Sequence, residues 1–175
     1  MQAVVAITEN GYQSISLRKL LSSLNLTTGS FYKHFESKTD LFENVAIEIS
    51  KSFSVQASSQ LRSNADALNR LIDLGEFIIH QMTYAPNLME FLLFNPSVIP
   101  IYAKKSDNHS FGLLTLTHQI VGELIEQYNL AQSENDLFIK VWSFIQGYGI
   151  LISKSAITYD RIFLLSVAKQ LIREK

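Results

Sequence analysis

The chain has 175 residues, of which 47% are hydrophobic, and a formal net charge of −1. This length allows a substantial core but no more than two modest domains. The absence of cysteine excludes disulfides and thiolate metal sites and fits a reducing, cytoplasmic location. The N-terminus lacks the features of a signal peptide, and apolar runs such as 91–94 and 150–152 are too short to span a membrane. A net charge near zero gives no support for nucleic-acid binding, so such a surface would need local positive charge.

The first part of the chain has the pattern of three short helices. Residues 3–9 are typical of the end of a helix that stops at Asn10-Gly11, where glycine can adopt a left-handed capping conformation. Ser16 can cap a second helix, and after a connection at 25–27 either Thr27 or Thr28 can cap a third at 29–34. The second helix has apolar residues at helical spacing: Leu17, Leu20, Leu21 and Leu24. Two short helices joined by a brief turn and preceded by another predict a helix-turn-helix.

Ser37 can cap a long fourth helix, which ends in a polar stretch at 54–64. We place a domain boundary there. Residues 1–53 are predicted to form a three-helix helix-turn-helix domain that binds DNA, with a shortened first helix because the chain starts inside it. Residues 54–175 are predicted to form a larger helical domain for ligand binding and dimerisation. Its helices are expected at 68–82, 88–94, 111–129, 135–156 and 159–173, with mostly loop at 97–110. No alternating strand pattern occurs, so the predicted fold class is all-α.

Positive charge is concentrated in the predicted helix-turn-helix, where Arg18, Lys19, Lys33 and Lys38 stand against one acid, Glu36. The stretch from Gly11 to Leu41 also resembles the DNA-binding domain of the TetR family. The matching positions are Gly11, Tyr12, Ser16, Arg18, Leu20, Leu26, Thr27, Gly29, Ser30, Phe31, Tyr32, His34, Phe35, Ser37, Lys38 and Leu41. Asn25 replaces the usual turn glycine, and asparagine tolerates the left-handed conformation. Leu21 and Leu24 replace small residues, so we expect a slightly wider spacing of the helix pair.

The resemblance implies a transcriptional regulator, usually a repressor that is released from its operator by a small-molecule effector. The residues implied to contact phosphates are Ser16, Thr27, Tyr32 and Lys38, with Arg18 as a further candidate. Those implied to read base edges are Thr28, Gly29, Ser30, Lys33 and His34. Phe31 and Phe35 are expected to point back into the domain. A homodimer would place two recognition helices about 34–36 Å apart on a near-palindromic operator.

The last two predicted helices are apolar over more than one face, which a surface helix of a monomer does not need. The residues assigned to a two-fold interface are Phe144, Tyr148, Leu151, Ile162, Leu165, Ala168 and Ile172. TetR-type proteins dimerise through their final two helices, in agreement with this assignment. The alternative is that both helices lie centrally in one monomer.

Aromatic residues and a few polar groups in the middle helices are candidates for a ligand pocket: Phe77, His80, Gln81, Tyr84, Met89, Phe94, His118, Trp142 and Tyr148. The region from Trp142 to Gly147 loosely resembles a W-x-x-x-H-G signature found in part of the family, with Gln146 in place of histidine. Because this set lacks a charged cluster, we expect a mostly apolar or aromatic effector. No cofactor or metal is indicated.

The sequence allows two other classes of function. An enzyme is disfavoured because the four histidines are scattered and no phosphate-binding or dinucleotide-binding glycine motif occurs. The other is a helical ligand-binding or interaction module that has lost DNA binding, which the short first helix favours.

Overall fold

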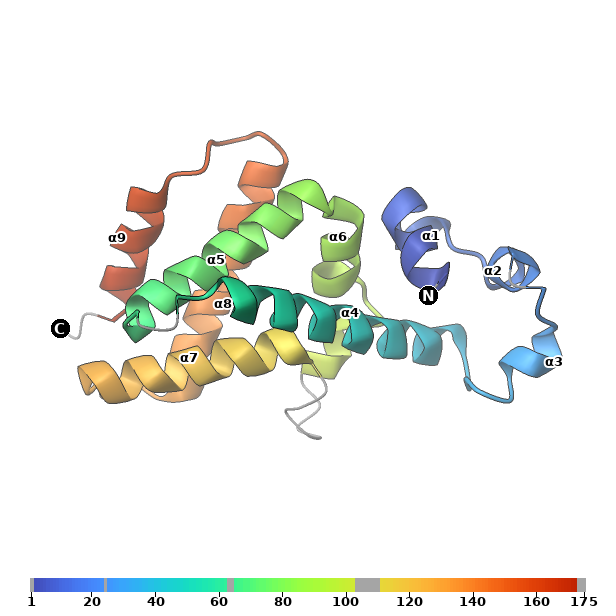
Figure 1. Cartoon of the computed structure of the whole chain (residues 1–175), viewed down its shortest axis with the longest axis horizontal. Coiled ribbons are helices and arrows are strands. Elements are labelled where there is room, and N and C mark those ends of the chain that lie inside the picture. Colours follow the sequence, from blue (N-terminus) through green and yellow to red (C-terminus); the bar gives the residue numbers. More distant parts are fainter. Residues whose placement is uncertain (1, 24, 63–64, 103–110, 173–175) are drawn as a thin grey trace. The chain divides into compact units, whose positions relative to one another are not determined.

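The computed structural model describes residues 2–23, 25–62, 65–102 and 111–172 (Figure 1). These residues contain helices and no strand, so the all-α prediction is confirmed. The α-helices are α1 (Gln2–Asn10), α2 (Leu17–Ser23), α3 (Thr28–Phe31), α4 (Lys38–Gln60), α5 (Ala67–Tyr84), α6 (Pro86–Phe94), α7 (Gly112–Tyr128), α8 (Glu134–Ser153) and α9 (Arg161–Leu171). Two 3-10 helices are η1 (Tyr12–Ser14) and η2 (Ile99–Tyr102). Within the described ranges, no helix is long and apolar enough to cross a bilayer.

Side-chain caps fix where several helices begin. Thr27 Oγ1 accepts from the Ser30 N–H at 3.1 Å, and Ser37 Oγ accepts from the Asp40 N–H at 3.1 Å, as the sequence predicts. Asp160 Oδ1 accepts from the N–H groups of residues 162 and 163. Because that carboxylate satisfies the first N–H groups of α9, this helix starts two residues later than the predicted 159. Leu24, residues 103–110 of the predicted loop and residue 173 of the predicted last helix lie outside the described residues.

The chain packs as two compact units that do not follow sequence order. The first unit comprises the chain up to Ser52 together with Ala85–Gly112, and therefore contains α6. The second comprises Phe53–Tyr84 and the chain from Leu113 onward. The sequence prediction of a helix-turn-helix domain at 1–53 followed by a domain at 54–175 did not anticipate that α6 packs with the N-terminal helices.

In the first unit, α6 supplies the aromatic centre. The Phe91 side chain is fully buried, and its ring centroid lies 5.9 Å from that of Tyr12 and 5.3 Å from that of Phe42. Asn87 Nδ2 donates to the Thr8 carbonyl oxygen at 2.8 Å, at the C-terminal end of α1. Aromatic rings in such tilted and edge-to-face pairs stabilise a core beyond the burial of their area. Helix α1 and η1 are therefore packed against a segment more than forty residues downstream in the chain.

In the second unit, α5 and α8 approach closely because Gly149 of α8 has no side chain. A Cβ atom at Gly149 would lie 2.3 Å from Met82 Sδ of α5, well inside van der Waals contact. Around this point both helices bury apolar residues, including Ile78, Ile79 and Ile145. The α5–α8 pair is therefore the most tightly constrained helix contact that the described glycines reveal.

We expect Gly149→Ala to lower the free energy of unfolding by about 1–3 kcal/mol, because Met82 must move out of a filled site. Gly122→Ala on α7 is the matched control, since its Cβ would meet only Glu134 Oε2, at 4.0 Å. The control should gain up to about 1 kcal/mol from helix propensity. Urea unfolding followed by circular dichroism measures both. An unchanged urea midpoint for Gly149→Ala would show that α5 and α8 can accommodate a Cβ atom at this position without loss of stability.

Candidate functional site

The connection between α2 and α3 is a tight turn centred on Asn25. Asn25 has a φ of 53°, in the left-handed region, as the sequence predicts for the residue that replaces the usual glycine. The Leu26 N–H donates to the Leu21 carbonyl at 2.9 Å and the Asn25 N–H to the Ser22 carbonyl at 3.2 Å. These bonds satisfy carbonyl groups at the end of α2 and direct the chain into α3.

Helix α3 is a single α-helical turn that continues as a hydrogen-bonded turn. The N–H groups of His34 and Phe35 both donate to the Phe31 carbonyl, at 2.9 and 3.1 Å. Phe31 is buried and Phe35 is half-buried, and their ring centroids are 5.4 Å apart, so both point back into the unit as expected. This aromatic pair anchors the segment and leaves its opposite side to solvent.

The predicted base-reading residues lie on that solvent side. Thr28, Gly29, Lys33 and His34 are exposed, and Ser30 is half-buried. A Cβ at Gly29 would meet only Thr27 Oγ1, at 3.9 Å, so the fold itself does not require glycine at this position. The absence of a side chain there instead permits close approach of a partner to the helix backbone.

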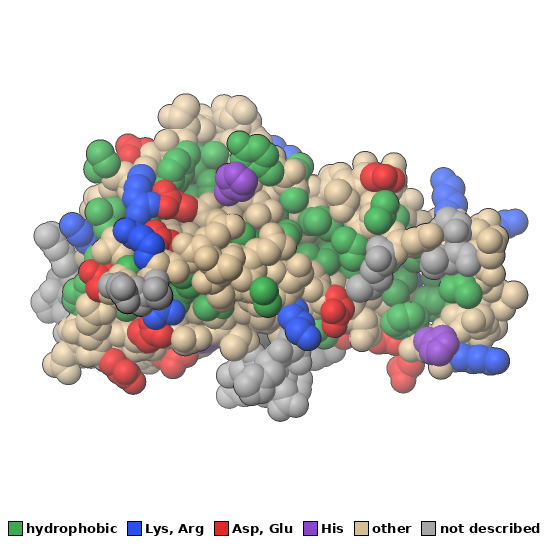
Figure 2. Space-filling model, in the orientation of Figure 1, with side chains coloured by type: hydrophobic (Ala, Val, Ile, Leu, Met, Phe, Trp, Pro, Cys, Tyr) green, Lys and Arg blue, Asp and Glu red, His purple; other side chains and the backbone are tan. Residues whose placement is uncertain are grey.

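The predicted phosphate-contacting residues border the same surface. Tyr32 is 56% exposed, and Ser16, Arg18 and Thr27 are also exposed. Lys and Arg side chains lie at the end of the first unit formed by α2 and α3 (Figure 2). The local charge that the sequence requires for DNA binding is therefore presented on the surface.

Lys38 differs from the other phosphate candidates because it is half-buried. Its Nζ donates to the Ile15 carbonyl at 2.5 Å and lies 4.9 Å from the centre of the Phe42 ring. Ile15 immediately precedes the residue that caps α2, so this ammonium group fixes the start of α2 against α4. The sequence pattern did not reveal this positioning role.

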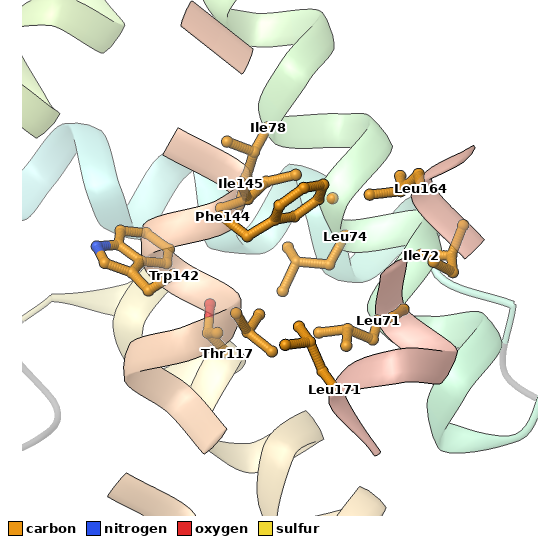
Figure 3. A pocket seen from close by; sticks show the side chains of 13 residues that line it. Leu71, Ile72, Leu74, Ile78, Thr117, Trp142, Phe144, Ile145, Leu164 and Leu171 are labelled. Carbon is orange, nitrogen blue, oxygen red and sulfur yellow. The ribbon is translucent and has the colours of Figure 1, made fainter. Parts of the chain in front are cut away.

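An apolar cavity lies in the second unit between α5, α7, α8 and α9 (Figure 3). Its volume is about 30 Å³. Its lining residues are Leu71, Ile72, Leu74, Gly75, Ile78, Thr117, Val141, Trp142, Phe144, Ile145, Leu164, Ala168 and Leu171. The one hydroxyl among these side chains, that of Thr117, donates to the Leu113 carbonyl at 2.7 Å. The cavity therefore offers a hydrocarbon surface.

The nine residues assigned to a pocket from the sequence do not line this one cavity together. Only Trp142 lines it, while Met89 and Phe94 belong to the first unit. His118 lies elsewhere on α7, with its Nδ1 2.9 Å from Glu134 Oε1. The Tyr148 hydroxyl accepts from the Asp160 N–H at 2.9 Å. Helical spacing identifies apolar faces, but it does not show which faces enclose a void.

The remaining pocket candidates border an open groove on another side of α5. Phe77, His80 and Gln81 line this groove, and the exposed Tyr84 ring stacks on His80 at 4.0 Å. The groove also contains Arg62, Asp73, Glu76 and Arg161, which together with Tyr159 form a polar cluster that we call the α9 clamp. Among the described residues, no three His, Asp or Glu side chains converge as a metal site would require.

The α9 clamp ties the start of α9 to α5. Asp73 accepts from Arg62 Nε at 2.8 Å and from Arg161 Nη2 at 3.3 Å, and Glu76 accepts from both Arg161 and the Tyr159 hydroxyl. Burial raises the pKa of Asp73, but hydrogen bonds from the two arginines outweigh it, so its pKa lies below the ordinary value. Burial and nearby acidic groups raise the pKa of Tyr159 to about 12, so the phenol stays protonated and donates at neutral pH.

The structure divides the seven residues assigned to the dimer interface. Leu151 and Ile162 are exposed, Ile162 to 80%. Tyr148 and Ala168 are each 5% exposed because they pack inside their own chain, which leaves them little surface for a partner. The other three, Phe144, Leu165 and Ile172, are half-buried.

Residues 2–45 match the sequence model of the bacterial regulatory proteins of the tetR family. This range contains α1 to α3 and the beginning of α4. A search of curated proteins found no matching sequence.

Solved structures share the fold over nearly the whole chain. The transcriptional regulator FadR from Bacillus subtilis, in complex with stearoyl-CoA, has a TM-score of 0.68 and 19% identity, covering 97% of this chain and 94% of that chain. The fatty acid degradation regulator FadR from Bacillus halodurans has a TM-score of 0.65 and 20% identity, with coverages of 97% and 89%. A tetR-family regulatory protein from Rhodococcus RHA1 has a TM-score of 0.61 and 15% identity, with coverages of 97% and 92%.

The lowered pKa of Asp73 predicts a pH dependence of stability. A carboxyl whose pKa is lower in the folded than in the unfolded state stabilises the fold above its unfolded pKa, about 4. That contribution is lost as the pH falls through the folded value. We therefore expect Asp73→Asn to be less stable than the parent near neutral pH and to lose less stability on acidification. Urea titrations from pH 7 to 3 measure this, with Glu126→Gln, an exposed position on α7, as control. Parallel stability curves for Asp73→Asn and the parent protein would contradict it.

Proposed function

We propose that this chain, whose residues 2–45 match the sequence model of the bacterial regulatory proteins of the tetR family, is a ligand-responsive repressor that binds a near-palindromic operator as a homodimer. Its place of action is then the cytoplasm, where the chromosome lies. The observation that carries the proposal is the solvent-facing side of α3 and the turn that follows it, which presents Thr28, Gly29, Lys33 and His34.

The residues of this surface have the chemistry that a major groove requires. Short hydroxyls and backbone N–H groups at the start of a helix suit phosphate oxygens, and Lys33 and His34 can donate to the acceptors on base edges. Phe31 holds the segment from behind, so that these groups need little reordering on binding. Arg18 and Tyr32 flank the segment and can meet the adjacent phosphates.

The DNA-contact assignment predicts a split between salt dependence and sequence preference. Lys38→Ala should lower the slope of log affinity against log salt by about 0.9, because one phosphate contact is lost. Lys33→Ala should instead change the preference at one base pair by about 1–3 kcal/mol. Fluorescence anisotropy with a duplex from upstream of the gene for this chain measures both effects. Lys154→Ala, on the exposed end of α8, is the control and should match the parent protein.

The role of Lys38 in positioning α2 gives this test a second arm. Thermal unfolding of Lys38→Ala reports the loss of the bond to the Ile15 carbonyl. If stability falls while the salt slope stays unchanged, Lys38 acts by positioning and its assignment as a phosphate contact is wrong. If no variant of this surface alters binding, the chain is a module that does not use α3 on DNA.

The proposed dimer surface consists of exposed apolar residues of α8, α9 and the segment between them. We call it the α8–α9 patch: Ile139, Ile150, Leu151, Ile157, Ile162 and Phe163. A monomeric surface rarely gathers so many large apolar side chains along two successive helices. A two-fold contact would bury them against the same residues of a second copy.

We expect Ile162→Glu to convert the dimer into a monomer at micromolar concentration, because a charge would be buried in an apolar contact. Glutamate in the first turn of α9 suits the helix dipole, so folding itself should be preserved. Val55→Glu on α4 is the matched control, as Val55 is also an exposed aliphatic residue but lies outside the patch. Sedimentation velocity distinguishes the states. A dimeric Ile162→Glu variant would assign the interface to another face.

We further infer that the effector carries a hydrocarbon chain. The apolar lining of the cavity between α5, α7, α8 and α9 supports this, and so does the stearoyl-CoA found with the similar regulator from Bacillus subtilis. Ligand binding would favour a state of the dimer with lower operator affinity, by a shift of population between two states. Addition of stearoyl-CoA to the protein–DNA complex should then lower the anisotropy, whereas free coenzyme A should not.

A further inference from the structure

Helix α9 forms one wall of the apolar cavity with one face and carries part of the α8–α9 patch on another. Leu164, Ala168 and Leu171 line the cavity from α9, and Figure 3 shows Leu164 and Leu171 facing residues of α5. Leu164 and Ala168 are the buried residues of α9, so few of its side chains contribute to the core. On the exposed side, Ile162 and Phe163 belong to the patch.

The cavity is too tight for a hydrocarbon chain as it stands. Its volume of about 30 Å³ is far smaller than a chain of several methylene groups. That space suits about one water molecule, yet the lining offers almost no polar surface to hold one. A chain of several methylene groups can be accommodated only if a wall moves.

The walls differ in how firmly they are held. Helices α5 and α8 interlock at Gly149 and Met82 and bury apolar side chains along much of their lengths. By contrast, polar contacts hold both ends of α9. The α9 clamp holds its start, where the Arg161 side chain is 43% exposed, and Gln132 Nε2 donates to the Leu171 carbonyl at 2.9 Å at its end. The clamp is partly exposed, with side-chain exposures of 43% for Arg161, 30% for Glu76 and 12% for Asp73, so salt is expected to weaken its ion pair at Glu76.

We propose that α9 is a lid over a binding site for a straight hydrocarbon chain, and that the chain is admitted when the α9 clamp opens at Glu76. This inference rests on the proposed function for the nature of the effector, and it adds where the chain binds and which element responds. The polar head of the ligand stays outside, because the side chains that line the cavity offer no free hydroxyl or charge for it. Because α9 also carries Ile162 and Phe163, its displacement changes the α8–α9 patch.

The site is tested with cis-parinaric acid, a straight-chain probe that fluoresces in apolar surroundings. Gly75→Ala adds a methyl group to the cavity wall, 3.2 Å from Ile145 Cδ1 and 3.6 Å from Leu164 Cδ2, and these flexible side-chain ends can yield slightly. The variant should fold, gain helix propensity and bind the probe roughly tenfold more weakly or worse. Gly122→Ala gains the same propensity away from the cavity and should bind like the parent protein. Equal affinity in both variants would overturn the site.

The lid is tested by the rate at which the probe binds. Glu76→Gln weakens the contacts to Arg161 and Tyr159 without altering α9 or the residues that line the cavity. In stopped-flow fluorescence it should accelerate association several-fold, and added salt should accelerate the parent protein in the same direction. Glu126→Gln is the matched control. An association rate that is insensitive to both Glu76→Gln and salt would overturn the lid.

These measurements contain no DNA. A chain that binds the probe as described but fails to bind an operator would contradict the proposed function and leave the lid standing. If the protein binds its operator but Gly75→Ala leaves the affinity for the probe unchanged, the proposed function stands and the proposed binding site is contradicted.

Discussion

The contact between α5 and α8 is the constraint on which the second unit depends. Because Gly149 has no side chain, Met82 of α5 occupies the space where a Cβ atom would lie, and a larger residue at this position would force Met82 to shift. Once this pair is fixed, the helices packed around it differ in their freedom. Helix α9 contributes only Leu164 and Ala168 as buried residues, and its ends depend on polar contacts. Elements with few buried residues open locally more readily than a packed core, so within this unit α9 is the helix that we expect to move first.

The first unit uses the same residues for fold and for surface. Phe31 and Phe35 anchor the short third helix, and this leaves Thr28, Lys33 and His34 turned to solvent. Lys38 combines two roles: its ammonium group donates to the Ile15 carbonyl, and it lies near the positively charged surface of α2 and α3. The order within the helix-turn-helix is thus a condition for any recognition by its exposed side chains.

Helix positions and the caps at Thr27 and Ser37 could be predicted because they depend on local spacing and on side chains next to the backbone they satisfy. Which side chains contact one another across the fold could not be predicted from the sequence. An apolar stripe does not say which helix covers it, so the packing of Phe91 with Tyr12 was missed, and of the proposed pocket residues only Trp142 lines the cavity. For the same reason the pattern predicts Tyr148 at a dimer interface, whereas its side chain is only 5% exposed in its own chain. Gly75 lines the cavity but has no side chain, so the spacing of apolar residues could not identify it as a lining residue.

The packing of α6 with the N-terminal helices bears on how such proteins can be recombined. Phe91 fills the space between Tyr12 and Phe42, and Asn87 satisfies a carbonyl at the end of α1. A chimera that took only the N-terminal helices from this chain would leave the rings of Tyr12 and Phe42 without Phe91, and the Thr8 carbonyl without the Asn87 donor. The unit that can be exchanged between proteins is therefore discontinuous in the sequence. A chimera needs α6 from the same parent protein as the N-terminal helices.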